Sequence, residues 1–292
     1  MRVVAVRKRR TANLTDGQAS AVRALVVAPK FELIPLSNAA EKAAELPAGS
    51  VVTVTASPSH GIEATLELAE TLARMGHAVV PHLSAHMIRD RAHLLEVLGR
   101  CSAAGFTRAF VVGGDAKDKG EFHDGLALIR AIEEAGHPFT EIGVPAYPEG
   151  HVDIPSDRLL EVLLEKQRFA SYMTTQMCFN PGAIVAWIGA MRSAGVALPV
   201  HLGTPGVAEL TKLMTISARI GIADSARYLK KNRKMVGSLL TPGKFGPDAL
   251  LVGMADALAD PGAKVEALHL FTFNQVGATL EWQERMLAEL GD

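Results

Sequence analysis

Short apolar runs alternate with longer segments of helical periodicity from about residue 30 to the end of the chain. The short runs are nearly continuously apolar and rich in β-branched residues, which is typical of parallel strands buried on both faces. An unbroken series of eight strand–helix units favours closure into a (β/α)8 TIM barrel. The expected strands are Phe31–Pro35, Val51–Ala56, Ala78–Ser84, Arg108–Gly113, Glu141–Ala146, Tyr172–Phe179, Pro199–Gly203 and Ala267–Phe273.

The intervening segments predict helices, and several of them end at a glycine. Glycine is the residue that most readily adopts the positive φ found just after a helix. Pro181 suits the first turn of its helix. The expected helices are Glu63–Met75, Ala92–Ala104, Gly125–Ala135, Leu159–Phe169, Pro181–Ser193 and Val207–Ile220, and the expected helix-ending glycines are Gly76, Gly105, Gly136, Gly195 and Gly221.

The length of 292 residues suits one barrel, whose typical size is roughly 250 residues. We expect a single catalytic domain over residues 30–292, preceded by an extension over residues 1–29. Within the extension, Val3–Val6 predicts a short strand, and Ala19–Val27 predicts a short helix or strand.

About 45 residues separate Gly221 from the last strand, which is too long for a simple loop. Helical patterns at Ala223–Lys231 and Leu250–Ala259 predict extra helices inserted before strand eight. These helices and the extension are the candidate surfaces for a homo-oligomer.

Composition argues against several classes of partner. Thirty basic residues balance 31 acidic ones, so no global field attracts nucleic acid or an anionic membrane, and the basic run Arg7–Arg10 is more simply a solvated segment. No apolar run approaches the roughly 20 residues of a membrane span, and no apolar signal-peptide core follows the basic run. Cys101 and Cys178 show neither zinc spacing nor a disulfide framework, so a reduced cytoplasmic protein is expected.

Polar residues gather where the expected strands end. A barrel enzyme carries its chemistry at the carboxyl ends of its strands. Any one of these residues alone is more often structural, but their convergence on one rim predicts an active site. The residues are Glu32, Thr55, His82, Ser84, Gly114, Asp115, Tyr147, Glu149, His151, Gln176, His201, Thr204, His269, Thr272 and Asn274.

Glu32 is the most informative of them because it interrupts the apolar run Phe31–Pro35. Burying a carboxylate is costly unless it has a partner. A carboxyl group in apolar surroundings holds its proton more tightly, which suits a general acid. Dinucleotide fingerprints, phosphate-binding loops and zinc motifs are missing from the sequence. A nucleotide cofactor would therefore bind in the barrel mouth.

The ordered strand ends resemble the methylenetetrahydrofolate reductase family over about residues 30–290. The most specific match is Tyr147-Pro148-Glu149-Gly150-His151 after strand five. Weaker matches lie at the expected strands and in the expected order: Phe31-Glu32, Val52–Thr55, Pro81-His82-Leu83, Gly114-Asp115, Thr175-Gln176 with Phe179, and His269–Asn274.

The resemblance implies a TIM barrel that converts 5,10-methylenetetrahydrofolate to 5-methyltetrahydrofolate with non-covalent FAD and NADH or NADPH. It implies that Glu32 is the general acid, that Asp115 lies near flavin and pterin, and that Gln176 holds the folate. The flavin contacts implied are Thr55, His82, Gly114, Asp115, Tyr147 and Lys166.

The sequence departs from the family pattern around the flavin. The family usually has an arginine where this chain has Gly113, and a tyrosine and a glycine where it has Ala56 and Ser57. Lys166 matches the family lysine only after a one-residue gap. These changes leave open a flavin-free enzyme with direct transfer from the nicotinamide. They also leave open a barrel oxidoreductase or lyase of another pterin or small carbonyl compound, and a non-catalytic folate- or flavin-binding protein.

Overall fold

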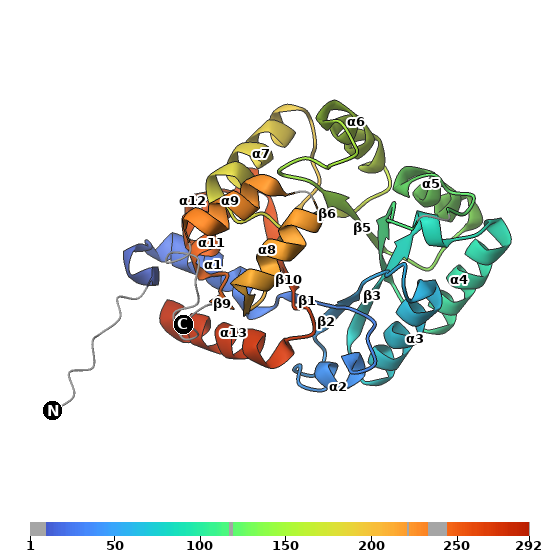
Figure 1. The fold of residues 1–292 in the computed structure, drawn as a ribbon, viewed down its shortest axis with the longest axis horizontal. Coiled ribbons are helices and arrows are strands. Elements are labelled where there is room, and N and C mark those ends of the chain that lie inside the picture. The colour runs from blue at the N-terminus through green and yellow to red at the C-terminus, as the bar shows by residue number, and fades with distance from the viewer. Residues whose placement is uncertain (1–9, 117–118, 221, 233–243, 292) are drawn as a thin grey trace.

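Eight parallel strands form a closed barrel in the order β1-β10-β7-β6-β5-β4-β3-β2 (Figure 1). The computed structural model describes residues 10–116, 119–220, 222–232 and 244–291. The predicted (β/α)8 TIM barrel is thus confirmed. The strands are β1 (Lys30–Leu33), β2 (Val51–Val54), β3 (Ala78–Ser84), β4 (Arg108–Val112), β5 (Glu141–Ala146), β6 (Tyr172–Thr175), β7 (Val200–Pro205) and β10 (Val265–Phe271).

The barrel closes where β1 pairs with β10. In that register Lys30 lies opposite His269, and Glu32 lies opposite Phe271. Successive residues of a strand point to opposite faces, so Lys30 and Glu32 share one face of β1. Leu33 lies on the opposite face and is fully buried in the main hydrophobic core.

Helices surround the strands (Figure 1). Side-chain caps begin several of them: Asp124 accepts hydrogen bonds from the amides of Leu126 and Ala127, and Asn180 accepts one from Gly182. The helices of the ring are α2 (Ala39–Ala43), α3 (Gly61–Arg74), α4 (Arg91–Ala103), α5 (Gly125–Ala135), α6 (Ser156–Lys166), α7 (Pro181–Ser193) and α13 (Val276–Leu290), with 3₁₀ turns η2 (Ala85–Met87) and η3 (Pro261–Ala263). Glycines after four helices have positive φ as predicted, namely Gly76, Gly105, Gly136 and Gly195, while Gly221 lies outside the described residues.

The described part of the predicted extension contains a 3₁₀ turn, η1 (Arg10–Asn13), and a helix, α1 (Asp16–Val27). A capping box between Thr15 and Gln18 begins the helix. Its residues Val22, Leu25 and Val26 belong to the main hydrophobic core, and the helix packs against α12 and α13. Ala19–Val27 is therefore helical, whereas Val3–Val6 and Arg7 to Arg9 lie outside the described residues.

The insertion before the last strand forms a separate small layer. It contains α8 (Leu210–Arg219), α9 (Ala223–Lys231), α11 (Asp248–Gly253), α12 (Ala255–Ala259) and an antiparallel pair of short strands, β8 (Ala208–Glu209) and β9 (Lys244–Phe245). The predicted extra helices are present, but Leu250–Ala259 is divided in two at Met254.

A second hydrophobic cluster joins this insertion to the barrel rim. Phe179 lies in it, and its ring meets that of Phe245 at 5.2 Å in an edge-to-face arrangement. The cluster explains why β6 ends at Thr175 and not at Phe179 as predicted. Residues after Thr175 leave the barrel and pack against the insertion.

Within the part of the chain that the structure describes, no helix has the length and apolar character required to cross a bilayer.

Candidate active site

Glu32 lies near the carboxyl end of β1, and its side chain is 14% exposed. Its Oε2 atom shares a hydrogen bond of 2.9 Å with Nε2 of His269 on β10. Nε2 of His82, from β3, lies 3.7 Å from the same oxygen. The surroundings of Glu32 are therefore two imidazoles, and not the apolar pocket expected from its sequence neighbours.

His82 is almost completely buried, and its ring centroid lies 4.7 Å from that of Phe110. Burial lowers the pKa of His82 to about 4, although the charge of Glu32 acts in the opposite direction. His82 is therefore neutral near pH 7 and makes a polar contact with Glu32 without forming an ion pair.

The segment after β10 fixes the backbone on both sides of Glu32. The Thr272 hydroxyl donates to the carbonyl of Glu32 at 2.6 Å. The amide of Asn274 donates to the carbonyl of Ile34 at 3.0 Å, and its oxygen accepts from the Ile34 N–H at 2.9 Å. Phe273 and Asn274 have φ of 49° and 60°, a strained region for residues other than glycine. Sequence reasoning placed Thr272 and Asn274 at the rim but did not anticipate that they hold Glu32.

Asp115 and Tyr147 follow neighbouring strands, β4 and β5. Asp115 is exposed, whereas burial raises the pKa of Tyr147 to about 12, with a further contribution from the charge of Asp115. The preceding Gly114 has a φ of 94°, and an added Cβ there would collide with the Ser84 hydroxyl. The turn thus requires glycine at this position.

Gln176 and Thr55 complete the predicted set at the rim. Gln176 follows β6, and its side-chain oxygen accepts from the amide of Met177 at 2.9 Å. Thr55 follows β2, and its carbonyl accepts from the Thr65 hydroxyl at 3.0 Å. Both side chains are half-buried.

Lys166 is placed differently from the other predicted residues. It shares the buried face of α6 with Leu163 and is only 8% exposed. Burial lowers its pKa, while Asp124 acts in the opposite direction. A Cβ on Gly125 would lie 3.2 Å from its Nζ atom, which puts the ammonium group against the start of α5.

Glu149 connects the rim to the insertion, a role that sequence reasoning did not assign. Its carboxylate accepts from the hydroxyl of Ser225 at 2.5 Å, from the amide of Ser225 at 3.0 Å and from the thiol of Cys178 at 3.0 Å. Ser225 lies in the first turn of α9, where the helix dipole favours a negative charge. His151, two residues further on, accepts from the Asp153 amide and shapes the loop.

These positions allow a test of whether the site suits FAD. Tyr147, Asp115 and Thr55 lie at strand ends where a planar ring system could bind, but His82 faces Glu32 inside the barrel. Of the two family cations, one is replaced by Gly113, and the other, Lys166, is buried beside the carboxylate of Asp124. The residues therefore do not fit the anionic dinucleotide part of FAD as the family pattern requires.

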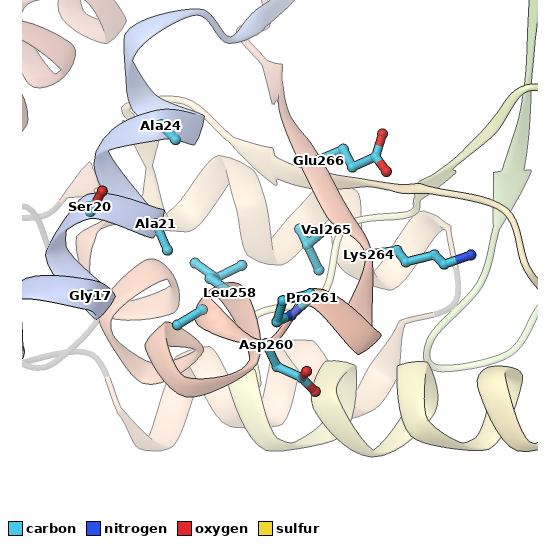
Figure 2. Close-up of a pocket in the computed structure, with 11 residues that line it drawn as sticks. Gly17, Ser20, Ala21, Ala24, Leu258, Asp260, Pro261, Lys264, Val265 and Glu266 are labelled. Carbon is cyan, nitrogen blue, oxygen red and sulfur yellow. The ribbon is translucent and has the colours of Figure 1, made fainter.

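A surface pocket of about 460 Å³ lies elsewhere, between α1 and the amino-terminal end of β10 (Figure 2). Leu258 and Val265 line it together with small residues of α1, including Ala21 and Ala24. It is at the opposite end of β10 from Phe271 and is separate from the rim. In the described ranges, no group of three or more histidine, cysteine, aspartate or glutamate residues could hold a metal ion.

Comparison with known proteins matches residues 18–286 to the family described as methylenetetrahydrofolate reductase. A probable methylenetetrahydrofolate reductase (NADPH) of Caenorhabditis elegans is 24% identical over 205 residues, covering 66% of this chain and 30% of that protein. Methylenetetrahydrofolate reductase 2 of Saccharomyces cerevisiae is 28% identical over 181 residues, covering 58% of this chain and 28% of that protein. The matched part is thus less than a third of the length of either relative.

Among solved structures, an uncharacterized protein from Clostridium thermocellum that binds two copies of 5-methyl-5,6,7,8-tetrahydrofolic acid superposes with a TM-score of 0.60. The alignment covers 89% of this chain and 94% of that one, at 11% sequence identity. At this identity the likeness establishes a shared fold.

Proposed function

The chain belongs to the methylenetetrahydrofolate reductase family, and from this we propose that it reduces 5,10-methylenetetrahydrofolate to 5-methyltetrahydrofolate with NADH or NADPH. The family match over residues 18–286 supports the reaction class. Folate binding by the structural neighbour from Clostridium thermocellum supports the substrate class. The observation that carries the proposal is the position of Glu32, a partly exposed carboxyl group held at the barrel rim by His269 and Thr272.

Glu32 supplies the proton in this proposal. The five-membered ring of the substrate must be protonated at nitrogen before it opens to an iminium whose carbon accepts hydride. Contacts of Oε2 with His269 and His82 orient the carboxyl group of Glu32, which protonates the substrate.

Asp115 and Gln176 are proposed to orient the pterin. They follow β4 and β6, on either side of the strand that presents Tyr147. Each can hydrogen-bond to a pterin ring edge, Asp115 as an acceptor and Gln176 through its amide. Such binding would hold the reacting carbon at a fixed distance from Glu32, which is how positioning lowers a barrier.

The hydride originates from the nicotinamide. Because the two cation positions differ from the family pattern, the hydride could pass to the folate directly or through a flavin. The absorbance spectrum of the purified protein separates the two routes: a flavin spectrum would support FAD as the intermediate carrier. Colourless protein that still reduces the folate would support direct transfer.

The proposed function is tested by NADH and NADPH oxidation with methylenetetrahydrofolate, with and without added FAD. Product formation is expected in at least one combination, and no turnover in any of them would refute the reaction. Glu32→Gln should abolish folate reduction while leaving the Kd for the nicotinamide unchanged. Glu161→Gln, an exposed glutamate on α6, is the matched control.

A further inference from the structure

The interior of the barrel beneath Glu32 contains several buried polar groups beside the apolar cluster of Val80, Phe110 and Tyr172, and a purely structural core does not require them. Thr53 Oγ1, Thr174 Oγ1, His82 Nε2 and His201 Nδ1 are buried, and none has a hydrogen-bond partner among the described residues. They come from β2, β6, β3 and β7. Buried polar groups in native proteins are almost always satisfied, by ordered water where no side chain reaches them.

The ammonium group of Lys30, the first residue of β1, lies nearer the amino-terminal ends of the strands. The Lys30 ammonium stands 4.2 Å from the centre of the Tyr172 ring, and that ring stacks on His201 at 3.8 Å. An added Cβ on Gly143 would overlap the Tyr172 ring, so glycine there makes room for it. Lys30, Tyr172 and His201 therefore form one contact group in the barrel centre.

The amino-terminal ends of the strands form the lower end of the barrel, and two charged residues there lie near Lys30. Arg108 and Glu141 begin β4 and β5, where they form an ion pair of 3.2 Å with both side chains about one-third exposed. Their charges act on Lys30 in opposite directions, while burial lowers the pKa of Lys30 to about 8. Burial also lowers the pKa of His201 to about 2, assisted by the positive charges of Lys30 and His269.

The proposed reaction consumes one proton in each cycle. Methylenetetrahydrofolate, NAD(P)H and a proton give methyltetrahydrofolate and NAD(P)⁺, so Glu32 ends each turnover as a carboxylate. The substrate, bound at the rim, covers Glu32 on the side of the mouth. A route from the opposite side would restore the proton while the mouth is occupied.

We propose that Lys30, His201 and His269, bridged by ordered water at the Thr53 and Thr174 hydroxyls, carry this proton from the lower end of the barrel to Glu32. The inference rests on the proposed function. His269 is the last carrier because it shares a hydrogen bond with Oε2 of Glu32. The Lys30 ammonium contacts the Tyr172 ring on which His201 stacks, and the charges of Lys30 and His269 both act on His201, which supports this order.

Each step transfers one proton and no electrons. The Lys30 ammonium releases a proton inward and regains one from solvent near the Arg108–Glu141 pair. Neutral His201 accepts a proton at one ring nitrogen while it releases one from the other. His269 then passes a proton to the carboxylate of Glu32.

Lys30→Arg, Lys30→Met and His201→Phe test the route. Arginine keeps the positive charge and the contact with Tyr172, but its pKa is so high that it does not release its proton. Phenylalanine keeps the stacking of His201 without its nitrogens. All three variants are expected to lose at least about tenfold in steady-state kcat for folate reduction, within the range of a proton-transfer contribution.

Rapid mixing separates this route from a structural role. Enzyme that starts with Glu32 protonated should complete its first turnover at close to the wild-type rate, and only later turnovers should be slow. Full activity of Lys30→Arg, or a first turnover slowed as much as the later ones, would overturn the route. Absence of folate turnover in the wild-type protein would instead overturn the proposed function.

Discussion

The imidazole of His269 shares a hydrogen bond of 2.9 Å with Glu32, across 237 positions of sequence. β1 and β10 are the first and last strands of the barrel and are direct neighbours in it. The candidate acid and the group that orients it therefore come from opposite ends of the described chain.

His269→Phe is expected to lower kcat for folate reduction by about tenfold to a hundredfold, toward the lower end of what a positioned general acid contributes. The reason is that the Glu32 carboxyl group loses the hydrogen bond that fixes its orientation. Steady-state kinetics would show the fall in kcat with little change in the KM for the nicotinamide. His269→Gln keeps a donor near Oε2 but cannot relay a proton, so it should recover part of the rate of the first turnover measured by rapid mixing. Equal first-turnover losses in both variants would contradict an orienting role.

Glu149→Gln is expected to lower the free energy of unfolding by about 1–3 kcal/mol, because buried donors of Ser225 and Cys178 lose a charged acceptor. Urea unfolding measures the change. Glu165→Gln is a suitable comparison, since its ion pair with Arg130 is partly exposed and should be worth no more than about 1 kcal/mol. If the two variants lost the same amount, Glu149 would not tie α9 to the rim.

Acid should destabilise the protein partly through His82. Its folded pKa of about 4 lies below the usual value of 6.5, so between these pH values the unfolded chain binds more protons than the folded one. Stability therefore falls as pH decreases through this range, by up to about 1.4 kcal/mol per pH unit for this one group.

Urea unfolding of His82→Asn at pH 7 and pH 5 tests this linkage. The variant should lose less stability between the two pH values than the wild-type protein does. Identical slopes would show that folding does not lower the pKa of His82.

Gly113→Arg is expected to tighten FAD binding by about tenfold, the gain of one charge-assisted hydrogen bond to a phosphate. A Cβ at Gly113 would meet only the Gly125 amide, at an ordinary contact distance of 3.8 Å. Titration of the protein with FAD, followed by the quenching of flavin fluorescence, measures the Kd. Gly113→Gln supplies the length without the charge and should have little effect. An unchanged Kd in Gly113→Arg would mean that the missing arginine does not limit flavin binding.

The barrel could be predicted because its strands are short and buried on both faces, which produces apolar runs that are easily recognised. Ala78–Ser84 and Glu141–Ala146 have the predicted bounds. The helix α13 was not predicted as an element, although its residues Val276, Thr279 and Trp282 form a buried face. The insertion was predicted to be helical, but its strand pair β8–β9 is too short to give a periodic signal.

The rim residues could be predicted as a group because parallel strands end together. Their individual contacts could not, since these depend on which residues meet across the barrel or over the rim. Glu149 meets Ser225 because the insertion folds back onto the loop after β5. Lys30 had no sequence signal for its position beside Tyr172, since the two strands lie far apart in sequence.

Lys166 shows the limit of carrying a role over from a family motif. The side chain lies on the buried face of α6, one turn from Leu163, and so faces the neighbouring helix α5. A shift of one residue along a helix rotates a side chain by about 100°, since a turn contains 3.6 residues. The one-residue gap in the family match is therefore enough to change which surface the lysine faces. Its assignment to a cofactor stays a prediction.

The pairing of β1 with β10 also bears on when the site forms during synthesis. A ribosome that has made little more than the first half of the chain has produced Glu32, Asp115 and Tyr147, but not the strand that closes the barrel. Until residues 265–274 emerge, Glu32 lacks its imidazole partner, and the edge of β1 is open to pairing with other chains. The last strand thus pairs with the edge of β1 and also supplies the imidazole that orients Glu32. A chain that lacks this strand has an exposed edge strand and a Glu32 side chain without its partner.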